Sequence, residues 1–478
     1  MKMLCSGSGQ RIGATALMWL FISLVPFGFA QGSTQDCDAI CALQKAFEQG
    51  GFQVTYGSAE PMNLAEMWCT NVPGVDSAWY SNYEPYIDLR VPKSADDASP
   101  QPNFQLRPDE AIVLIGPTPP PIKYFGFHRF ISSKVYPDGS RHPIHATLGD
   151  AVNNLTIKTI GPTPFSSPVA LIFTPDKGTD ARIRAVLQGS GYPEAIINTV
   201  VFPASMLNLG HGESADELRI TIRSGPVWQT DDGDAYVADP PLTIIRVTPQ
   251  TRAAIDPFPV PRLRVRGTGQ TEMDLMNKLE ELRAGIVAAN PGLAATDFRS
   301  HPYWYEGYDY LQRGVDPDGD TRDCFFLTAG WVPEYGSSDE ITLGDGEFLM
   351  VYGANHTATG KATYASVNVY ASETAKLLIG SVTDDDLQGS ATPYLPAGDP
   401  AAKKLYAYKV SRDCVRGEPG CLQLSVPEGC TRLTLDSKTV LGLVFRMFAE
   451  PATKVGPAMP EILYDRIVKF SQRPSKSH

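Results

Sequence analysis

Apolar residues recur along this chain with two different periods. In the segments 36–51, 179–191 and 271–290 they fall at helical spacing, which predicts amphipathic helices. Paired glycines end the first two segments, at Gly50-Gly51 and at Gly189 and Gly191. The third has the longest apolar stripe, formed by Met273, Leu275, Met276, Leu279, Leu282 and Ile286.

Short runs of β-branched and aromatic residues, bounded by Gly and Pro, predict strands over most of the remaining chain. The segment 168–204 has the order strand, helix, strand. Because strands far outnumber helices, we expect an α+β fold of mainly antiparallel sheets with few helices. The predicted strands are 52–57, 111–116, 124–131, 168–176, 195–204, 217–225, 242–249, 324–332, 347–353, 362–371, 375–382, 404–410, 439–448 and 461–471.

Two Pro-rich stretches, 92–108 and 253–267, interrupt these patterns and predict domain boundaries. We expect an N-terminal disulfide-containing segment and linker over 31–108. A first α+β domain would follow over 109–252 and a second over 253–478. The pair "LRITIRSG" and "LTIIRVTP" is echoed by "LGLVFRMF" and "YDRIVKFS", with Arg223 and Arg446 in matching places. The halves could be diverged copies, although strand alternation alone produces such echoes.

Residues 1–30 have the pattern of a cleaved signal peptide. Lys2 and Arg11 precede an apolar stretch over 14–27, and Gly28 and Ala30 are small residues at the expected cleavage point. The apolar stretch is shorter than the roughly 20 residues that span a bilayer. An uncleaved N-terminal anchor is the alternative. We expect a secreted or periplasmic protein without stable membrane insertion.

The charge balance narrows the classes of partner. Removing Lys2 and Arg11 with the leader leaves 39 basic and 53 acidic residues, a formal charge of −14. Nucleic-acid binding needs a basic face, so we exclude nucleic acid as a partner. A small molecule or a glycan remains a candidate ligand.

Seven cysteines follow the leader, and an oxidising compartment predicts disulfides among them. Spacing suggests that Cys69 pairs with Cys37 or Cys41, and that two of Cys414, Cys421 and Cys430 pair with each other. An odd number leaves one thiol free or paired with another chain. A zinc site at the C-terminal trio is the alternative, but the trio has no C-x-x-C spacing and no neighbouring histidine.

The stretch 351–371 superficially resembles a phosphate-binding loop. Six residues instead of four separate Gly353 from Gly360, and Ala362 stands where a hydroxyl should follow Lys361. The residues that follow alternate as a strand, whereas a phosphate loop opens a helix. We therefore predict a β-hairpin whose polar turn presents Asn355, His356 and Lys361, for acid–base chemistry or anion binding. A solvated turn without function is the alternative.

Two other loops carry candidate chemistry. In "RHPIHATLGDAVNN", His142 and His145 could hold a transition metal with Asp150, although Pro143 argues against an aligning helix, and Asn154 closes the stretch. In "DPDGDTRD", Asp316, Asp318 and Asp320 resemble the start of a calcium loop. The glycine there is misplaced and no Glu stands at position twelve. Asp-Gly turns alone explain most runs of the second kind.

Histidines elsewhere add two more candidates. His211 lies between two glycines, which would let the imidazole approach a ligand closely. His128 and Arg129 lie on the strand 124–131, where alternation points them to opposite faces. A connecting turn and a structural histidine are the alternatives.

Two functions follow from these residues. The first is an extracytoplasmic enzyme with a His/Asp/Lys site between the halves, with His356, Lys361, His211 and Asp150 as catalytic candidates. Asn355, Asn154, His128 and Arg129 would bind the ligand there. The second is a non-catalytic protein that binds a ligand or carbohydrate on aromatic residues such as those of 301–310. The sequence has no G-x-S-x-G or HExxH motif.

Overall fold

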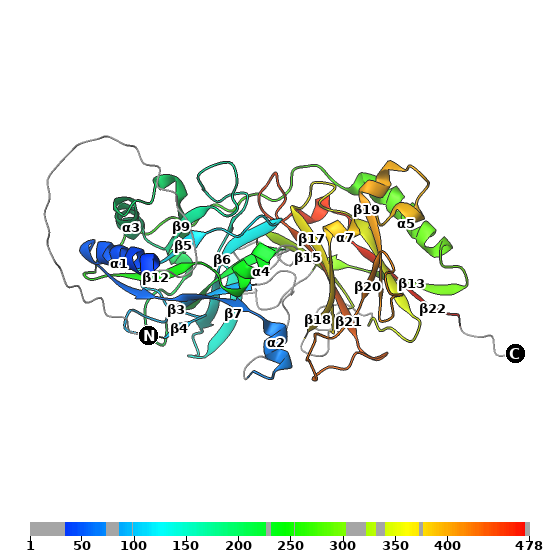
Figure 1. The fold of residues 1–478 in the computed structure, drawn as a ribbon, viewed down its shortest axis with the longest axis horizontal. Helices are drawn as coiled ribbons and strands as arrows, with labels where there is room; N and C mark the ends of the chain where they lie inside the picture. Colours follow the sequence, from blue (N-terminus) through cyan, green and yellow to red (C-terminus); the bar gives the residue numbers. More distant parts are fainter. Residues whose placement is uncertain are drawn as a thin grey trace.

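The computed structural model describes residues 34–72, 86–97, 99–225, 231–252, 254–302, 322–330, 340–371 and 376–473. These residues form four β-sheets. Strands between residues 52 and 249 build the first two sheets, and strands between 293 and 472 build the third and fourth. Figure 1 shows the two groups of strands next to each other, with the blue-to-green part of the chain on the left.

The first sheet has the strand order β1-β12-β5-β9-β10. Neighbouring strands are antiparallel except β9 and β10, which are parallel and connected by a helix. This confirms the strand–helix–strand unit predicted over 168–204. The strands are β1 (Phe52–Tyr56), β5 (Ala111–Pro117), β9 (Pro168–Thr174), β10 (Ile197–Val201) and β12 (Thr243–Pro249).

The second sheet has the order β2-β3-β11-β6-β7, with β4 paired to β3 and β8 paired to β6. All of its pairings are antiparallel. The strands are β2 (Ser58–Met62), β3 (Tyr86–Pro92), β4 (Pro100–Gln101), β6 (Tyr124–Val135), β7 (Arg141–Thr147), β8 (Val152–Asn153) and β11 (Glu217–Gly225).

The third sheet has the order β13-β22-β16-β19-β20, antiparallel except for the parallel pair β19 and β20. Its strands are β13 (Leu293–Arg299), β16 (Phe348–Ala354), β19 (Leu405–Ser411), β20 (Cys421–Gln423) and β22 (Arg466–Gln472). The fourth sheet has the order β14-β15-β21-β17-β18 and is antiparallel. Its strands are β14 (His301–Pro302), β15 (Cys324–Ala329), β17 (Tyr364–Ala371), β18 (Leu377–Thr383) and β21 (Leu441–Phe448).

Helices pack on the first and third sheets. The longer ones are amphipathic: Leu43, Phe47, Ile183 and Leu187 face the first sheet, and Leu279, Leu282 and Ile286 face the third. Asp176 caps the helix after β9 by accepting from the Thr179 amide at 2.7 Å. The α-helices are α1 (Thr34–Gln49), α2 (Leu64–Cys69), α3 (Lys177–Gly189), α4 (Asp231–Ala238), α5 (Met276–Ala288) and α7 (Asp384–Leu387). Single 3-10 turns are η1 (Glu194–Ile196), η2 (Ala204–Met206), η3 (Met273–Leu275), η6 (Thr392–Tyr394), η7 (Pro400–Lys403) and η8 (Met459–Glu461).

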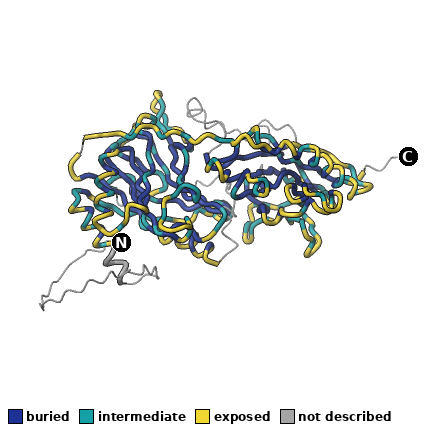
Figure 2. Tube along the Cα trace, turned by 90° about the horizontal axis from the view of Figure 1, so that it is seen from above, coloured by how far each residue is buried: buried dark blue, intermediate teal, exposed yellow. Residues whose placement is uncertain are grey.

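The main apolar cores lie between paired sheets. One core joins the inner faces of the first and second sheets, and another joins those of the third and fourth. Each group of strands is therefore layered as helix, sheet, sheet, and Figure 2 shows the buried strands inside each group. The prediction of an α+β fold of mainly antiparallel sheets with few helices is confirmed. The predicted domain boundaries stay predictions, although β1 to β4 lie in the same sheets as the strands of 109–252.

The predicted hairpin over 347–370 is wrong. β16 pairs with β19 and β22 in the third sheet, whereas β17 pairs with β18 and β21 in the fourth. Residues 355–363 therefore cross from one sheet to the other. The strand that follows them, in place of a helix, supports the conclusion that this is no phosphate-binding loop.

Two disulfides are present among the described residues. Cys414 pairs with Cys421, as predicted for the C-terminal trio. The predicted pairing of Cys69 with Cys37 or Cys41 is wrong, because Cys69 pairs with Cys430. In the described part of the chain, no helix is long and apolar enough to cross a membrane.

Candidate functional site

His356 lies in a buried charge cluster within the second group of strands. Its Nδ1 contacts Glu272 Oε1 at 3.0 Å, and its Nε2 lies 3.6 Å from Asp465 Oδ2. Asp465 in turn accepts from the Tyr406 hydroxyl at 2.6 Å. Burial alone would lower the pKa of His356, but the Glu272 and Asp465 carboxylates outweigh it and raise the pKa to about 10. At neutral pH this imidazole is a cation, so it cannot act as a general base.

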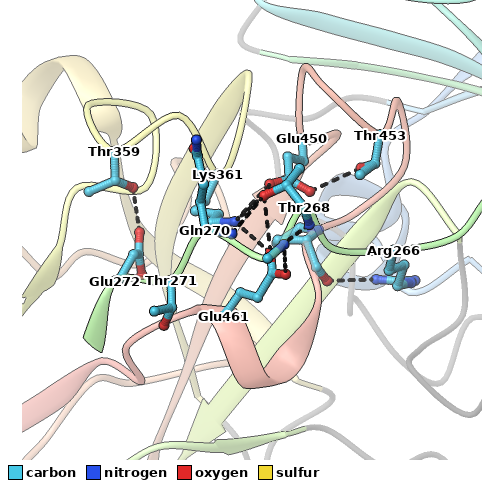
Figure 3. A network of polar contacts seen from close by, with 12 residues as sticks. Arg266, Thr268, Gln270, Thr271, Glu272, Thr359, Lys361, Glu450, Thr453 and Glu461 are labelled. Carbon is cyan, nitrogen blue, oxygen red and sulfur yellow. Dashed lines mark hydrogen bonds and ion pairs between the residues drawn. The ribbon is translucent and has the colours of Figure 1, made fainter. Parts of the chain in front are cut away.

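Lys361 lies in a second charge cluster on the same crossover. Its Nζ contacts Glu461 Oε2 at 2.6 Å, Glu450 Oε1 at 2.9 Å and Thr268 Oγ1 at 3.2 Å. Burial would lower the pKa of Lys361, but these carboxylates raise it. Figure 3 shows Lys361 between Glu450, Glu461 and the segment that connects the two groups of strands. Lys361 is therefore a fixed cation and not an available nucleophile.

Glu272, at the end of the same connecting segment, provides a second contact with the crossover. Glu272 accepts hydrogen bonds from the Thr359 hydroxyl and from the Leu463 amide, the latter at 2.8 Å. Asn355, at the start of the crossover, is also buried and donates to Asp384 O at 3.3 Å. The crossover therefore anchors the connecting segment and presents no solvated polar turn.

A third polar cluster lies where the two groups of strands meet. The Tyr124 hydroxyl is 3.1 Å from His128 Nε2 and donates to Asp323 Oδ2 at 3.1 Å. Asn153 donates to the same oxygen at 2.6 Å. Burial raises the pKa of Asp323 to about 6, although the Asn153 and Tyr124 hydrogen bonds oppose it. Burial lowers the pKa of His128 well below its usual range, and the neighbouring charges of Arg223 and Arg129 lower it further.

These groups form a hydrogen-bonded chain from neutral His128 through Tyr124 to Asp323. A carboxyl that titrates near neutrality, connected to a neutral imidazole, has the properties of an acid–base pair. All three side chains are at most 1% exposed. A ligand could reach them only if the two groups of strands moved apart.

Other predicted site residues surround this junction. Arg129 points to the opposite face of β6 from His128, as predicted, and donates to Val201 O and Asp150 O. Asp150 pairs with Arg322, the residue before Asp323, at 3.0 Å. Asn154 donates to Lys123 O at 3.3 Å. Four predicted residues, His128, Arg129, Asp150 and Asn154, are therefore brought to the junction.

His211 is placed elsewhere. Its Nε2 contacts Glu110 Oε2 at 3.0 Å, and Glu110 also accepts from Arg246 at 2.8 Å and from Thr248 at 2.8 Å. Burial would raise the pKa of Glu110, but His211 and Arg246 lower it to about 2. This cluster lies at the beginning of β5 and stabilises the first sheet.

The predicted metal ligands do not form one site among the described residues. His142 is exposed and bonds to Ser140 at 2.7 Å, whereas the His145 ring stacks on Phe130 at 4.7 Å. Asp316, Asp318 and Asp320 lie outside the described residues. In the part of the chain that the structure describes, one group has metal-ligating geometry, Cys414 with Glu418 and Cys421. Its sulfurs are bonded to each other, so they cannot serve as thiolate ligands while the disulfide is intact.

An open groove of about 310 Å³ lies beside the His356 cluster. Met273, Met276 and Met459 supply apolar walls, and Arg299 and Arg466 lie opposite each other on β13 and β22. Asp465 lines this groove and also a small internal cavity that His356 lines. The groove therefore lies directly against the buried charges.

No family model matches this chain, and no curated protein matches it. A crystal structure of the VPA0106 protein from Vibrio parahaemolyticus is similar with a TM-score of 0.38 and 12% identity, over 90% of this chain and 99% of that one. The N-terminal tandem CBM22 domain of Paenibacillus barcinonensis Xyn10C matches with a TM-score of 0.13 and 8% identity, over 88% of this chain and 94% of that one. Neither similarity is close enough to support a conclusion about fold or function.

Sequence reasoning missed Tyr124, Glu272, Asp323, Tyr406 and Asp465. One signal was available: Tyr124 and His128 are four apart on a strand, so they share a face. Glu272 and Asp465 follow no motif and are almost two hundred residues apart, so only the fold brings them to His356.

Proposed function

We propose that this chain is an exported protein built from two diverged copies of one α+β unit, and that the second copy binds a small amphipathic organic anion. The copies span 34–249 and 273–472. Export is supported by the leader pattern of residues 1–30 and by disulfides that fit an oxidising compartment.

The strand orders support the duplication. The first and third sheets have the same topology. The order β1-β12-β5-β9-β10 corresponds strand by strand to β13-β22-β16-β19-β20. The second and fourth sheets agree in the same way. The order β2-β3-β11-β6-β7 corresponds strand by strand to β14-β15-β21-β17-β18. In both groups the parallel pair lies at the same edge of the sheet, and one helix, α1 or α5, precedes the first strand.

Corresponding charges support the same alignment. Glu110 precedes β5 and pairs with Arg246 at 2.8 Å, and Glu347 precedes β16 and pairs with Lys469 at 2.7 Å. In each case the amide three residues earlier, of Arg107 or Gly344, donates to the same carboxylate.

The two arginines of the echoed sequence also correspond. Arg223 lies over the ring of Tyr86, its directly opposite residue on β3, at 4.8 Å. Arg446 lies over Phe326, its directly opposite residue on β15, at 5.3 Å. The outer faces of the second and fourth sheets thus share an arginine–aromatic pair.

The copies differ where His356 lies. The pairing registers of β5 and β16 with their neighbours align the two copies residue by residue. In this alignment His356 corresponds to Pro119. Tyr406 corresponds to Val169, and Asp465 corresponds to Leu242. A Cβ on Gly116 would collide with Leu242, and one on the corresponding Gly353 would collide with Asp465. Because the first copy folds with apolar residues here, the fold does not require the polar set. We assign that set to the function of the second copy.

The groove beside Asp465 is the observation that carries the binding function. Its volume of about 310 Å³ lies at the lower end of the range for small-molecule sites. Methionine walls accept apolar groups of varied shape because the side chain is flexible and polarisable.

Charge at the rim selects an anion. Arg466 pairs with Glu280 at 2.6 Å, whereas Arg299 has no ion-pair partner among the described residues. Like charges directly opposite on neighbouring strands repel, so an anionic group between Arg299 and Arg466 would offset this repulsion. A carboxylate with an alkyl or aryl body fits both the walls and the rim.

Calorimetric titration of the mature protein with dodecanoate tests this proposal, with dodecanol as the uncharged control. We expect dodecanoate to bind with the larger affinity. Arg299→Gln should weaken dodecanoate by about two- to fivefold, the range of one exposed ion pair, and leave dodecanol unchanged. Arg262→Gln, an exposed arginine outside the groove, is the matched control.

Met273→Trp fills the groove from an exposed position and should abolish binding of both probes. Binding that survives Met273→Trp would refute the groove as the site. Equal affinity for dodecanol and dodecanoate would refute the preference for an anion alone.

An enzyme with its site at the junction is the second candidate. The chain His128–Tyr124–Asp323, with the pKa of Asp323 near 6, favours it. It would require an opening of the junction, which the groove does not.

A further inference from the structure

A small cavity lies inside the second group of strands, between the third and fourth sheets. Its volume is about 10 Å³, close to the smallest that holds one water molecule. Asn355, His356, Asp384, Tyr406 and Asp465 are polar residues of its lining.

Three buried imidazole or carboxylate atoms on this lining make no hydrogen bond among the described residues. They are His356 Nε2, Asp384 Oδ1 and Asp465 Oδ2. The first and last of these atoms form an ion pair at 3.6 Å, a separation too long for a direct hydrogen bond and one that a water molecule can bridge. Their side chains are 4%, 6% and 2% exposed. Leaving such an atom unsatisfied costs about 1–3 kcal/mol, and more when the group is charged. Three unsatisfied atoms around one cavity indicate a shared partner.

We infer that this cavity binds one ordered water molecule, which accepts a hydrogen bond from His356 Nε2–H and donates one to Asp465 Oδ2 and one to Asp384 Oδ1. Three hydrogen bonds are typical of a buried water. The inference does not depend on the ligand proposed for the groove.

Water fits this site better than a metal ion. Glu272 holds one imidazole nitrogen of His356, and with a pKa of about 10 the other nitrogen also carries a proton. A doubly protonated imidazole has no lone pair to offer a metal and repels cations. Water can accept from this donor and donate to two carboxylates.

The bound water would connect two regions. Asp465 lines the groove, whereas Asp384 pairs with Lys123 of the first group of strands at 2.7 Å. The polar connection therefore runs from the groove wall through the water to the junction. Pro119 and Leu242 occupy the corresponding positions of the first copy and offer no side-chain hydrogen bonds, so we expect no such water there.

A high-resolution crystal structure of the mature protein tests this inference. We expect one spherical density peak within hydrogen-bonding distance of all three atoms. A cavity without density would overturn the inference, and so would a peak that gains anomalous signal after a rubidium soak. Oxygen-17 relaxation dispersion in solution provides a measurement that does not require crystals, and a missing long-lived water signal would contradict the inference.

Two variants make the test specific. Asp465→Leu introduces the residue of the first copy and should remove the long-lived water signal. Asp465→Asn retains a polar oxygen of the same size and should retain the water. If Asp465→Leu does not fold, the crystal structure of the unmodified protein and the Asp465→Asn variant still decide between the outcomes.

Discussion

Cys69 and Cys430 are 361 residues apart in the sequence and are joined by a disulfide. Cys69 ends α2, which belongs to the first group of strands, and Cys430 follows β20 of the second. Arg432 strengthens this contact, because its guanidinium lies 4.3 Å from the Trp68 ring and donates to Trp68 O at 2.6 Å. The disulfide is therefore a covalent connection between two parts of the molecule with separate cores.

Replacing both Cys69 and Cys430 by Ser should lower the free energy of unfolding by about 2–5 kcal/mol, because the unfolded chain loses a long covalent loop. Urea unfolding of the oxidised protein measures this. The matched control, Cys414→Ser with Cys421→Ser, removes a loop of seven residues and should cost less. A larger loss in the control would contradict the loop argument.

The charge on His356 should make stability fall at alkaline pH. Its pKa is raised from about 6.5 in the unfolded chain to about 10 in the folded protein, so the folded state binds the extra proton. The stabilisation is complete below pH 6.5 and is lost as pH rises through 10, by on the order of a few kcal/mol. Unfolding free energies between pH 6 and pH 10 test this.

His356→Gln should remove that slope, whereas His142→Gln, at an exposed position, should retain it. An unchanged slope in His356→Gln would show that another group titrates in this range.

The buried Asp323 carboxyl should change stability at acidic pH, below the pH range in which His356 titrates. Its pKa is raised from about 3.8 to about 6, so stability falls as pH rises from 4 to 6 and stays lower above 6. Asp323→Asn retains the shape without the charge, and it should gain up to about 3 kcal/mol relative to the unmodified protein between pH 4 and pH 8. Denaturant unfolding at these two pH values measures the difference, and an equal response in both proteins would contradict it.

Lys361→Met should lower the free energy of unfolding by about 3–5 kcal/mol, because it leaves the buried Glu450 carboxylate without its cation. Thermal unfolding at neutral pH measures the loss. Lys404→Met, which changes an exposed lysine, should have little effect. Equal losses in the two variants would refute the anchoring role of Lys361.

Glu110 and Glu347 occupy corresponding positions in the proposed duplication, but they should contribute unequally to stability because they differ in burial. Glu110 is fully buried with three side-chain partners, so Glu110→Gln should cost about 2–4 kcal/mol. Glu347 is 22% exposed, and Glu347→Gln should cost about 1 kcal/mol or less. Urea unfolding of both variants compares the two copies directly.

Local patterns predicted most elements but not their partners. The helices α1, α3 and α5 and the strands of both echoed pairs follow from periodicity, because each buries one face or both. Periodicity cannot tell which sheet a strand joins, so β16 and β17 were expected to form a hairpin although they belong to different sheets. The disulfide between Cys69 and Cys430 was not predicted for the same reason, because sequence distance says little about spatial distance.

The candidate site was predicted only in part. His128 and Asp150 were expected between the halves and lie at the junction, since β6 begins there and the loop after β7 reaches it. His356 and Lys361 were expected on the polar turn of a hairpin. They are buried instead, because Glu272 of the connecting segment and Glu461 of the chain before β22 pair with them. No local sequence pattern predicts a contact with carboxylates so distant in the sequence.

The polypeptide passes between the two groups of strands over residues 250–272, and the Cys69–Cys430 bond lies outside that stretch. A protease that cut once within the stretch would therefore yield two fragments that still migrate as one species on a non-reducing gel. Only added reductant would separate them, so a single cut in this stretch would not divide the oxidised protein into two pieces.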